Sequence, residues 1–190
     1  MIPDPEAREW CARAAAGDRE AAGALLREFQ APIHAYLRRL SDNDADASDL
    51  TQITFVKVWR SLDRFQGASS VSTWIHRIAY CSYVDWRRRC RPNDPRSDHW
   101  WSHLPAAGPA PSDQASDLDA ARKIHASVAR LPEEERQAIH LHYYQNLTLA
   151  ESAEVMALPL GTLKYRLRGA LDRLRRDLPA AELPRPARTD

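Results

Sequence analysis

The residues best suited to chemistry in this chain are cations interleaved with aromatic rings, on a predicted helix that runs toward Arg91. At about 100° per residue, one side of that helix carries them together. They are His76, Arg77, Tyr80, Tyr83, Arg87, Arg88 and Arg91. Cations attract phosphate and exposed rings give unpaired bases a surface for stacking, so this side suits single-stranded nucleic acid. The alternative is a solvated basic helix end with two amphipathic tyrosines.

A second basic surface is predicted on the helix that follows Pro159. Its apolar stripe consists of Leu160, Leu163, Leu167, Ala170, Leu171, Leu174 and Leu178. The other side carries Thr162, Tyr165, Arg166, Gly169, Arg173 and Arg176, with Lys164 and Arg168 on a flank. Thr148 and Glu151 form a capping box that starts a short helix just before it. A short helix, a tight turn and a long basic helix are typical of a helix-turn-helix.

This predicted helix-turn-helix assigns roles to the basic side chains. The first two turns of the second helix enter the major groove, where bases would be read by Thr162, Lys164, Tyr165 and Arg168. Phosphates would be contacted by Arg166, Arg173 and Arg176. The alternative is a solvated basic helix on a three-helix core, and the capping box and turn together favour DNA binding over it.

A third surface is predicted on the helix from Asp49 to Leu62. Its core stripe consists of Phe55, Val58, Trp59 and Leu62, and roughly opposite lie Asp49, Gln52, Ile53, Val56 and Arg60. A helix side that only meets water would not carry Ile and Val among its polar residues. We therefore expect a partner protein to cover this side.

Other site chemistries find little support. No nucleophile with a base, Gly-rich phosphate loop or paired carboxylate site is recognisable, so we predict neither an enzyme nor a cofactor. His140 and His142 cannot share a helical face, and His99 and His103 have no cysteine nearby, so we predict no metal site.

The cysteines indicate a reducing compartment rather than a disulfide framework. Cys11, Cys81 and Cys90 are an odd and scattered set. Cys81 borders an apolar stripe and is expected to be a packed thiol. Cys90 lies beside arginines, so we expect its pKa to be somewhat lower.

Charge and length limit the possible partners. The 190 residues include 27 Lys and Arg against 26 Asp and Glu, so any nucleic-acid surface must be local. The beginning, "MIPDPEAREW", has early acids and no apolar run, so a signal peptide is not expected. No stretch approaches the length of a membrane span, and we expect a soluble, cytoplasmic protein without membrane insertion.

The elements that must position these residues are helices. Strand signals are nearly absent, while Ala, Leu, Arg and Glu recur with helical spacing, which predicts an all-α fold. We expect a helical domain over 1–91, a flexible linker over 92–117, a second helical domain over 118–178 and a disordered tail over 179–190. Pro32 would kink or divide the helix that contains it. The pair Trp100–Trp101 is expected to dock on the domains or a partner, or to form a local clasp.

Two stretches of this chain resemble bacterial RNA polymerase sigma factors of the extracytoplasmic-function (ECF) group. "DLTQITFVKVWRSLDRFQGASSVSTWIHRIA" followed by "DWRRR" is similar to the sigma-two domain. "LPEEERQAIHLHYYQNLTLAESAEVMALPLGTLKYRL" is similar to the sigma-four helix-turn-helix domain. The resemblance covers nearly the whole chain. It implies a factor that binds core RNA polymerase and directs promoter-specific initiation.

The resemblance also implies roles for residues. The beta-prime clamp helices would contact Asp49, Gln52, Ile53, Val56 and Arg60, and the beta flap would be a further polymerase contact. The minus-ten promoter element would be opened, with one base flipped into a pocket, by Gly67, Ala68, Ser69, Ser70, His76, Arg77, Tyr80, Tyr83, Arg87 and Arg88. The minus-thirty-five element would be read by Thr162, Lys164, Tyr165, Arg166, Arg168 and Arg173. The linker would thread through the polymerase cleft, and an anti-sigma factor would control the protein.

Three positions depart from the family pattern. Ile53 follows the Gln where an acid is usual, which implies a more apolar clamp contact. Tyr80 and Cys81 stand where the family usually has Arg and Asn beside the flipped-base pocket, so we expect an altered base preference. Tyr165 replaces a common Ser and should change contacts at the minus-thirty-five element.

Two other classes of protein remain as alternatives. A two-domain helix-turn-helix transcriptional regulator that does not act as a polymerase subunit explains the last helix equally well. It leaves unexplained the arginine-rich aromatic side of the other domain and the exposed Ile53 and Val56. An adaptor or anti-sigma protein that binds polymerase without DNA does not account for the basic recognition helix.

Overall fold

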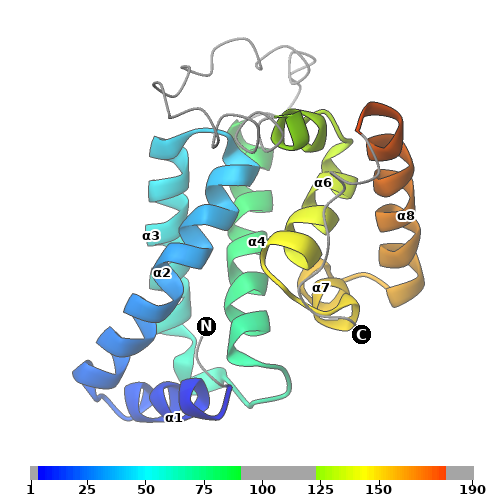
Figure 1. The fold of residues 1–190 in the computed structure, drawn as a ribbon. Helices are drawn as coiled ribbons and strands as arrows, with labels where there is room; N and C mark the ends of the chain where they lie inside the picture. The colour runs from blue at the N-terminus through cyan, green and yellow to red at the C-terminus, as the bar shows by residue number, and fades with distance from the viewer. Residues whose placement is uncertain (1–3, 91–122, 179–190) are drawn as a thin grey trace, which may run out of the picture.

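The computed structural model describes residues 4–90 and 123–178, and every regular element in these ranges is helical (Figure 1). The N-terminal unit, residues 4–90, consists of α1 (Asp4–Ala15), α2 (Arg19–Ser41), α3 (Asp44–Arg60), the 3-10 turn η1 (Leu62–Arg64) and α4 (Val71–Cys90). The C-terminal unit, residues 123–178, consists of a helical segment over 123–129, α6 (Glu133–Ile139), the π-helix η4 (His140–Tyr144), α7 (Leu149–Met156) and α8 (Leu160–Asp177). The predicted all-α fold is confirmed. Trp100 and Trp101, His99 and His103, and the predicted linker and tail lie outside the described residues.

Helix α2 runs unbroken through Pro32, which neither ends nor divides it. Its N-cap is Asp18, whose carboxylate accepts hydrogen bonds from the backbone N–H groups of Glu20 and Ala21 at 2.9 and 3.1 Å. Proline removes one backbone hydrogen bond from the helix. Fully buried side chains on both sides of Pro32, such as Phe29 and Tyr36, hold the helix to its neighbours across that gap.

The core of the N-terminal unit lies between α2, α3 and α4, and α1 packs across one end of them (Figure 1). Its fully buried side chains include Phe29, Ile33, Tyr36, Leu37, Leu50, Val58 and Ile75. Burying each large aliphatic or aromatic side chain contributes about 1.5–3 kcal/mol. This core fixes α3 and α4, the two helices that carry the predicted binding surfaces of this unit.

The core stripe predicted for α3 is partly wrong. Val58 and Leu62 are buried, but Phe55 is half-buried and Trp59 is 51% exposed. The buried face is rotated toward Thr51 and Thr54, whose hydroxyls donate to the backbone carbonyls one turn earlier at 2.7 Å. Because these hydroxyls are satisfied within the helix, polar side chains can occupy the core and leave Trp59 at its edge.

The C-terminal unit has the predicted capping box and amphipathic last helix. The Thr148 backbone N–H donates to the Glu151 carboxylate at 2.9 Å, and the Glu151 N–H donates to the Thr148 hydroxyl at 3.2 Å. The buried stripe of α8 consists of Leu163, Leu167, Ala170 and Leu174, and Leu178 beyond its end is also buried. Leu160 is exposed and Leu171 half-buried, so the predicted stripe is corrected at its first residue and at Leu171.

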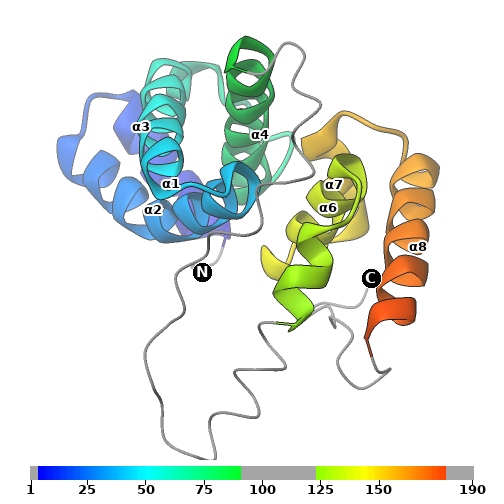
Figure 2. The ribbon, with the colours of Figure 1, turned by 90° about the horizontal axis from the view of Figure 1, so that it is seen from above.

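The two units lie against each other through α4 and α7, and through α2 and η4 (Figures 1 and 2). Cys11 is buried in the N-terminal unit, whereas Cys81 on α4 is exposed, which corrects its predicted packing. Among the described helices, none has both the length and the apolar character needed to cross a membrane.

Candidate protein-binding groove and nucleic-acid surfaces

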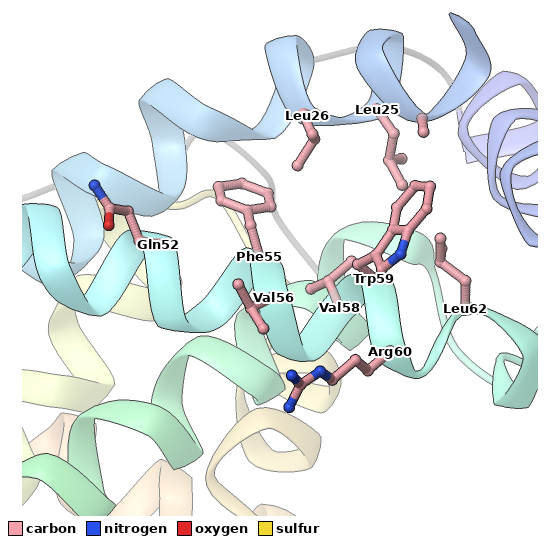
Figure 3. A pocket seen from close by; sticks show the side chains of 10 residues that line it. Leu25, Leu26, Gln52, Phe55, Val56, Val58, Trp59, Arg60 and Leu62 are labelled. Atoms are coloured by element: carbon pink, nitrogen blue, oxygen red, sulfur yellow. The ribbon is translucent and has the colours of Figure 1, made fainter. Parts of the chain in front are cut away.

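An apolar groove of about 580 Å³ lies between α2 and α3 (Figure 3). It is lined by Ala22, Leu25, Leu26, Gln52, Phe55, Val56, Val58, Trp59, Arg60 and Leu62. Val56 is 50% exposed and Trp59 51% exposed, although both are large and apolar. We call this surface the α2–α3 groove.

The predicted polymerase-binding residues lie on and beside this groove. Asp49, Gln52, Ile53, Val56 and Arg60 all reach the surface of α3, as the sequence predicts. The groove extends this predicted surface toward α2 through Leu26, Phe55 and Trp59, which the sequence prediction does not include. Exposed apolar side chains bordered by polar ones suit a partner helix that lays its apolar face into a groove.

The loop that joins η1 to α4, residues 65–70, is held in place from α1. Arg8 donates one hydrogen bond to the carbonyl of Gly67 at 2.8 Å and another to the carbonyl of Ser69 at 2.7 Å. Its third guanidinium nitrogen pairs with the carboxylate of Asp4. Asp4 also accepts a hydrogen bond from the N–H of Val71, the first residue of α4, at 2.8 Å.

Asp4 and Arg8 could not be placed at this loop from the sequence. Their spacing is that of an ordinary acid–base pair on a helix surface, and such pairs are common. No pattern links α1 to Gly67 or Ser69, because the contact depends on how α1 packs across the unit. Only the fold brings them together.

The predicted nucleic-acid side of α4 faces the C-terminal unit. His76 and Tyr83 are 0% and 2% exposed, so the predicted surface positions of these two side chains are corrected. The Tyr83 hydroxyl donates to the Glu133 carboxylate at 2.5 Å, and Arg87 forms an ion pair with the same carboxylate at 2.6 Å. Arg77 donates to the backbone carbonyl of Glu154. We call this set of interactions the closed contact.

The N-terminal end of α4 takes part in the closed contact through Glu151. The hydroxyls of Ser70 and Thr73 donate to the Glu151 carboxylate at 3.2 and 3.1 Å. The same carboxylate serves the capping box of α7 with Thr148. One side chain therefore both starts α7 and joins the two units.

Burial and hydrogen bonding change the acidity of groups in the closed contact. Burial lowers the pKa of His76, against the raising effect of its hydrogen bonds to the Ser72 carbonyl and to Gln145. Burial, and then the charge of Glu133, raises the pKa of Tyr83, which stays a neutral hydroxyl donor. Burial raises the pKa of Glu151, but its hydrogen bonds outweigh that effect and the net shift is downward, so it accepts as a carboxylate.

On α8, the predicted base-reading side chains are presented to solvent. Lys164 and Arg168 are exposed, Tyr165 is 79% exposed, and Thr162 is half-buried. Pro159 precedes the first turn, and Ala157, with φ of 54°, makes the sharp turn after α7. This arrangement leaves the start of α8 accessible to a groove of duplex DNA.

Two of the three predicted phosphate contacts on α8, Arg166 and Arg173, are paired with the acidic first turn of α6, and the third, Arg176, is exposed. Glu134 forms an ion pair with Arg166 at 2.6 Å, and Glu135 forms one with Arg173 at 3.1 Å. Glu133 pairs with Arg87 from α4. Consecutive carboxylates thus hold arginines from both predicted DNA surfaces.

The remaining predicted site residues are placed as follows. Tyr80 is half-buried, and Ala68 and Arg88 are exposed. His140 and His142 are buried, and the Nδ1 of His142 lies 2.8 Å from the Leu147 carbonyl. Within residues 4–90 and 123–178, His, Cys, Asp and Glu side chains form no group of three or more that could hold a metal ion.

Comparison with known families gives two matches along the chain. The family described as Sigma-70 region 2 matches residues 25–91, and Sigma-70, region 4 matches residues 128–176. The first range contains α4 and every residue of the α2–α3 groove except Ala22, and the second contains α7 and all of α8 except its last residue. Both predicted resemblances are therefore found where the sequence placed them.

Curated relatives match over most of their length. The ECF RNA polymerase sigma factor RpoE of Cereibacter sphaeroides is 32% identical over 162 residues, which cover 85% of this chain and 88% of the relative. The ECF RNA polymerase sigma factor SigW of Bacillus subtilis is 27% identical over 170 residues, which cover 85% of this chain and 91% of the relative.

Two solved structures share the fold. CnrH in complex with the cytosolic domain of CnrY matches with a TM-score of 0.67 and 23% identity, over 90% of this chain and 96% of that chain. The sigma factor RpoE in complex with the anti-sigma factor NepR from Bartonella quintana matches with a TM-score of 0.61 and 23% identity, over 80% of this chain and 92% of that chain.

Proposed function

The chain belongs to the ECF family of RNA polymerase sigma factors, and from this membership we propose how its surfaces share the work of promoter-specific initiation. The α2–α3 groove and the adjoining Asp49, Gln52 and Ile53 bind the clamp of core RNA polymerase. The loop over 65–70 and the basic side of α4 open the minus-ten element. Lys164, Tyr165 and Arg168 on α8 read the minus-thirty-five element. The protein acts in the cytoplasm with the polymerase and performs no covalent chemistry of its own.

The observation that carries this proposal is the separation of two exposed surfaces on two units. Val56 and Trp59 present apolar area on the N-terminal unit, and Lys164 and Tyr165 present a basic helix start on the C-terminal unit. A regulator that binds duplex DNA alone would use only the second surface. A polymerase-bound factor uses both.

Opening the promoter requires no nucleotide hydrolysis in this mechanism. Flipping a base out of the stack costs a few kcal/mol, which stacking and pocket contacts offset. Rings and cations on α4 would supply those contacts once α4 is uncovered. The polymerase holds the two units at the spacing of the two promoter elements. Binding of one element therefore raises the effective concentration of the other unit at its own element.

The test is promoter binding with and without core polymerase. Labelled duplex promoter fragments are titrated with the protein alone and with the protein plus core enzyme. The proposal predicts weak binding alone and sequence-specific binding only with core enzyme. Equally tight, sequence-specific binding without polymerase would instead support a helix-turn-helix transcriptional regulator that does not act as a polymerase subunit.

The closed contact occupies side chains that the proposed function assigns to the minus-ten element. Ser70, His76, Arg77, Tyr83 and Arg87 are predicted for the minus-ten element, and each bonds to the C-terminal unit. The same side chains cannot contact DNA while they hold Glu133, Gln145, Glu151 and the Glu154 carbonyl. We propose that the free protein is closed and that loading on polymerase separates the units.

Glu133→Gln should loosen the closed contact. Its amide can still accept from Tyr83 but loses the charge that pairs with Arg87, and a hydrogen bond to a charged group contributes about 1.5–3 kcal/mol. We expect a larger radius of gyration in small-angle X-ray scattering and a severalfold gain in polymerase-free DNA binding. Glu134→Gln is the matched control for the scattering measurement, because the ion pair of Glu134 with Arg166 lies inside the C-terminal unit. Scattering curves for the wild type and Glu133→Gln that superimpose would contradict the closed free state.

Acid should favour the open form. The pKa of His76 is lowered from 6.5 in the closed structure, so the closed form takes up a proton less readily than an open form that exposes the ring. The neutral His76 ring therefore stabilises the closed form relative to the open form above its ordinary pKa. This stabilisation is lost as pH falls from 6.5 toward the lowered pKa. The groups around the ring are Ser72, Gln145, the Glu151 carboxylate and Tyr36, whose ring centroid lies 5.7 Å from that of the imidazole. The pKa of His140 is shifted in the same direction, through burial and then nearby arginines.

The measurement is the radius of gyration between pH 7.5 and 5.5. We expect expansion on acidification that is reduced in His76→Gln, whose side chain cannot take up a proton. An identical pH response in wild type and variant would exclude His76 as a source of the effect.

An anti-sigma factor is the further partner that we propose. In one solved structure of the same fold, the sigma factor RpoE of Bartonella quintana is in complex with the anti-sigma factor NepR. The α2–α3 groove offers such a protein an apolar site for one helix, and an occupant there would exclude the polymerase clamp. Competition between the two for Val56 and Trp59 would then control initiation.

A further inference from the structure

The loop over 65–70 is shaped by a frame of side chains from outside it. Two of its carbonyls, those of Gly67 and Ser69, accept from separate nitrogens of the Arg8 guanidinium. The guanidinium also lies over the Phe65 ring, 5.8 Å from its centroid, and that ring packs against Trp74 at 4.9 Å. The loop is therefore fixed at its start, in its middle and, through Val71 and Asp4, at its end.

This use of Arg8 differs from that of a surface ion pair. All three guanidinium nitrogens are engaged, one by the carboxylate of Asp4 and two by backbone carbonyls. A planar fork of fixed donors can hold two carbonyls at a set separation, which a single ammonium does poorly. Charge-assisted hydrogen bonds of this kind are about twice as strong as neutral ones.

The backbone of the loop depends on the same contact. Gly67 has φ of 72°, in the left-handed region that favours glycine. A Cβ at this position would collide with the Arg8 guanidinium. The close approach of Arg8 and the absence of a side chain at Gly67 therefore belong to one arrangement.

We propose that Arg8, oriented by Asp4, is a positioning residue for capture of the flipped minus-ten base. It touches neither DNA nor polymerase in this role and acts by holding the carbonyls of Gly67 and Ser69. The hydroxyls and N–H groups that the loop presents are thereby set in one geometry before the base arrives. A pocket ordered in advance loses less conformational entropy on binding. This inference rests on the proposed function, in which the loop receives an unpaired base of the promoter.

The test uses the full chain assembled with core RNA polymerase. The holoenzyme is mixed with single-stranded DNA carrying the non-template strand, randomised over the minus-ten region, and the bound strands are sequenced. For the captured position, the readout is the enrichment of the preferred base over the other three. In Arg8→Ala we expect this ratio to fall about tenfold, which corresponds to about 1.4 kcal/mol of discrimination.

Arg13→Ala is the matched control. Arg13 lies on the same helix and pairs with Asp18 and Glu9, away from the loop. Its removal should leave base selectivity at the wild-type level. Binding of minus-thirty-five duplex by the same holoenzymes should be equal in all variants, because α8 is not altered. Should Arg8→Ala fold poorly, Arg8→Lys keeps a charge for Asp4 but replaces two separate donors by one ammonium, and selectivity should still fall.

The outcomes separate this inference from the proposed function. Wild-type holoenzyme that enriches no base at any position would overturn base capture by the loop, and this inference with it. Wild-type selectivity that persists in both Arg8→Ala and Arg8→Lys would overturn the inference alone. A loss of selectivity confined to the Arg8 variants would support it.

Discussion

Asp49→Arg is expected to weaken binding to core RNA polymerase about a hundredfold while the fold stays intact. Asp49 lies at the surface of α3 beside the α2–α3 groove, so its replacement alters no buried packing. A partner surface that accepts a carboxylate meets a cation instead, and like charges placed together at an interface cost several kcal/mol. The measurement is the equilibrium dissociation constant for core enzyme, from fluorescence anisotropy of the labelled protein.

The matched control for this prediction is Glu9→Arg, which makes the same change of charge at an exposed position on α1. It should bind core enzyme within about twofold of the wild type, because long-range effects between exposed charges are largely screened at physiological salt. Thermal unfolding of both variants checks the fold. Equal affinity of Asp49→Arg and Glu9→Arg would show that the polymerase does not contact this side of α3.

Lys164→Ala combined with Arg168→Ala is expected to remove most of the sequence preference at the minus-thirty-five element. Both side chains are exposed on the first turns of α8, where a helix-turn-helix contacts base edges. A good side-chain contact to a base contributes about 1–3 kcal/mol of discrimination. We therefore expect the wild-type difference between a selected element and a scrambled one to shrink about tenfold or more. The measurement is holoenzyme binding to the two fragments.

Arg175→Ala serves as the control on the same helix. Arg175 is exposed near the end of α8 and pairs with Asp172 at 2.8 Å, far from the turns that would enter the groove. Its loss should lower affinity slightly and equally for all sequences. The same uniform loss in Lys164→Ala with Arg168→Ala, with a shallower dependence on salt, would assign these residues to phosphates instead of bases.

Local sequence patterns were sufficient to predict the features that depend on interactions between residues close together in the chain. The capping box of Thr148 and Glu151 and the buried stripe through Leu163 and Leu167 depend on residues within a few turns of one another. The exposure of Ile53 and Val56 was also predictable, because an apolar residue on a polar helix side has few neighbours to pack against.

Features that depend on contacts between distant segments were not predictable. His76 and Tyr83 lie on the polar side of α4 by their spacing, but the C-terminal unit covers them, and no periodicity within α4 contains that information. The exposure of Trp59 follows from Thr54, whose satisfied hydroxyl allows it to occupy the core. Arg8 reaches the loop only because α1 crosses the end of the unit.

We expect the acidic first turn of α6 to weaken binding of the free protein to non-specific DNA. Arg87, Arg166 and Arg173 are each paired with a carboxylate at the start of α6. We expect DNA phosphates to compete with these carboxylates for the arginines. The pair of Arg87 with Glu133 joins the two units, whereas the pairs of Arg166 and Arg173 lie within the C-terminal unit.

Run-off transcription tests the assignment as a polymerase initiation factor most directly. Core RNA polymerase, this protein and a library of promoter-length fragments are incubated with nucleotides, and the 5′ ends of the transcripts are sequenced. We expect defined start sites that appear only with the protein, preceded by two enriched elements at a constant separation, and lost with Asp49→Arg. Start sites that do not depend on the protein, or their absence while the protein binds duplex DNA without polymerase, would contradict it.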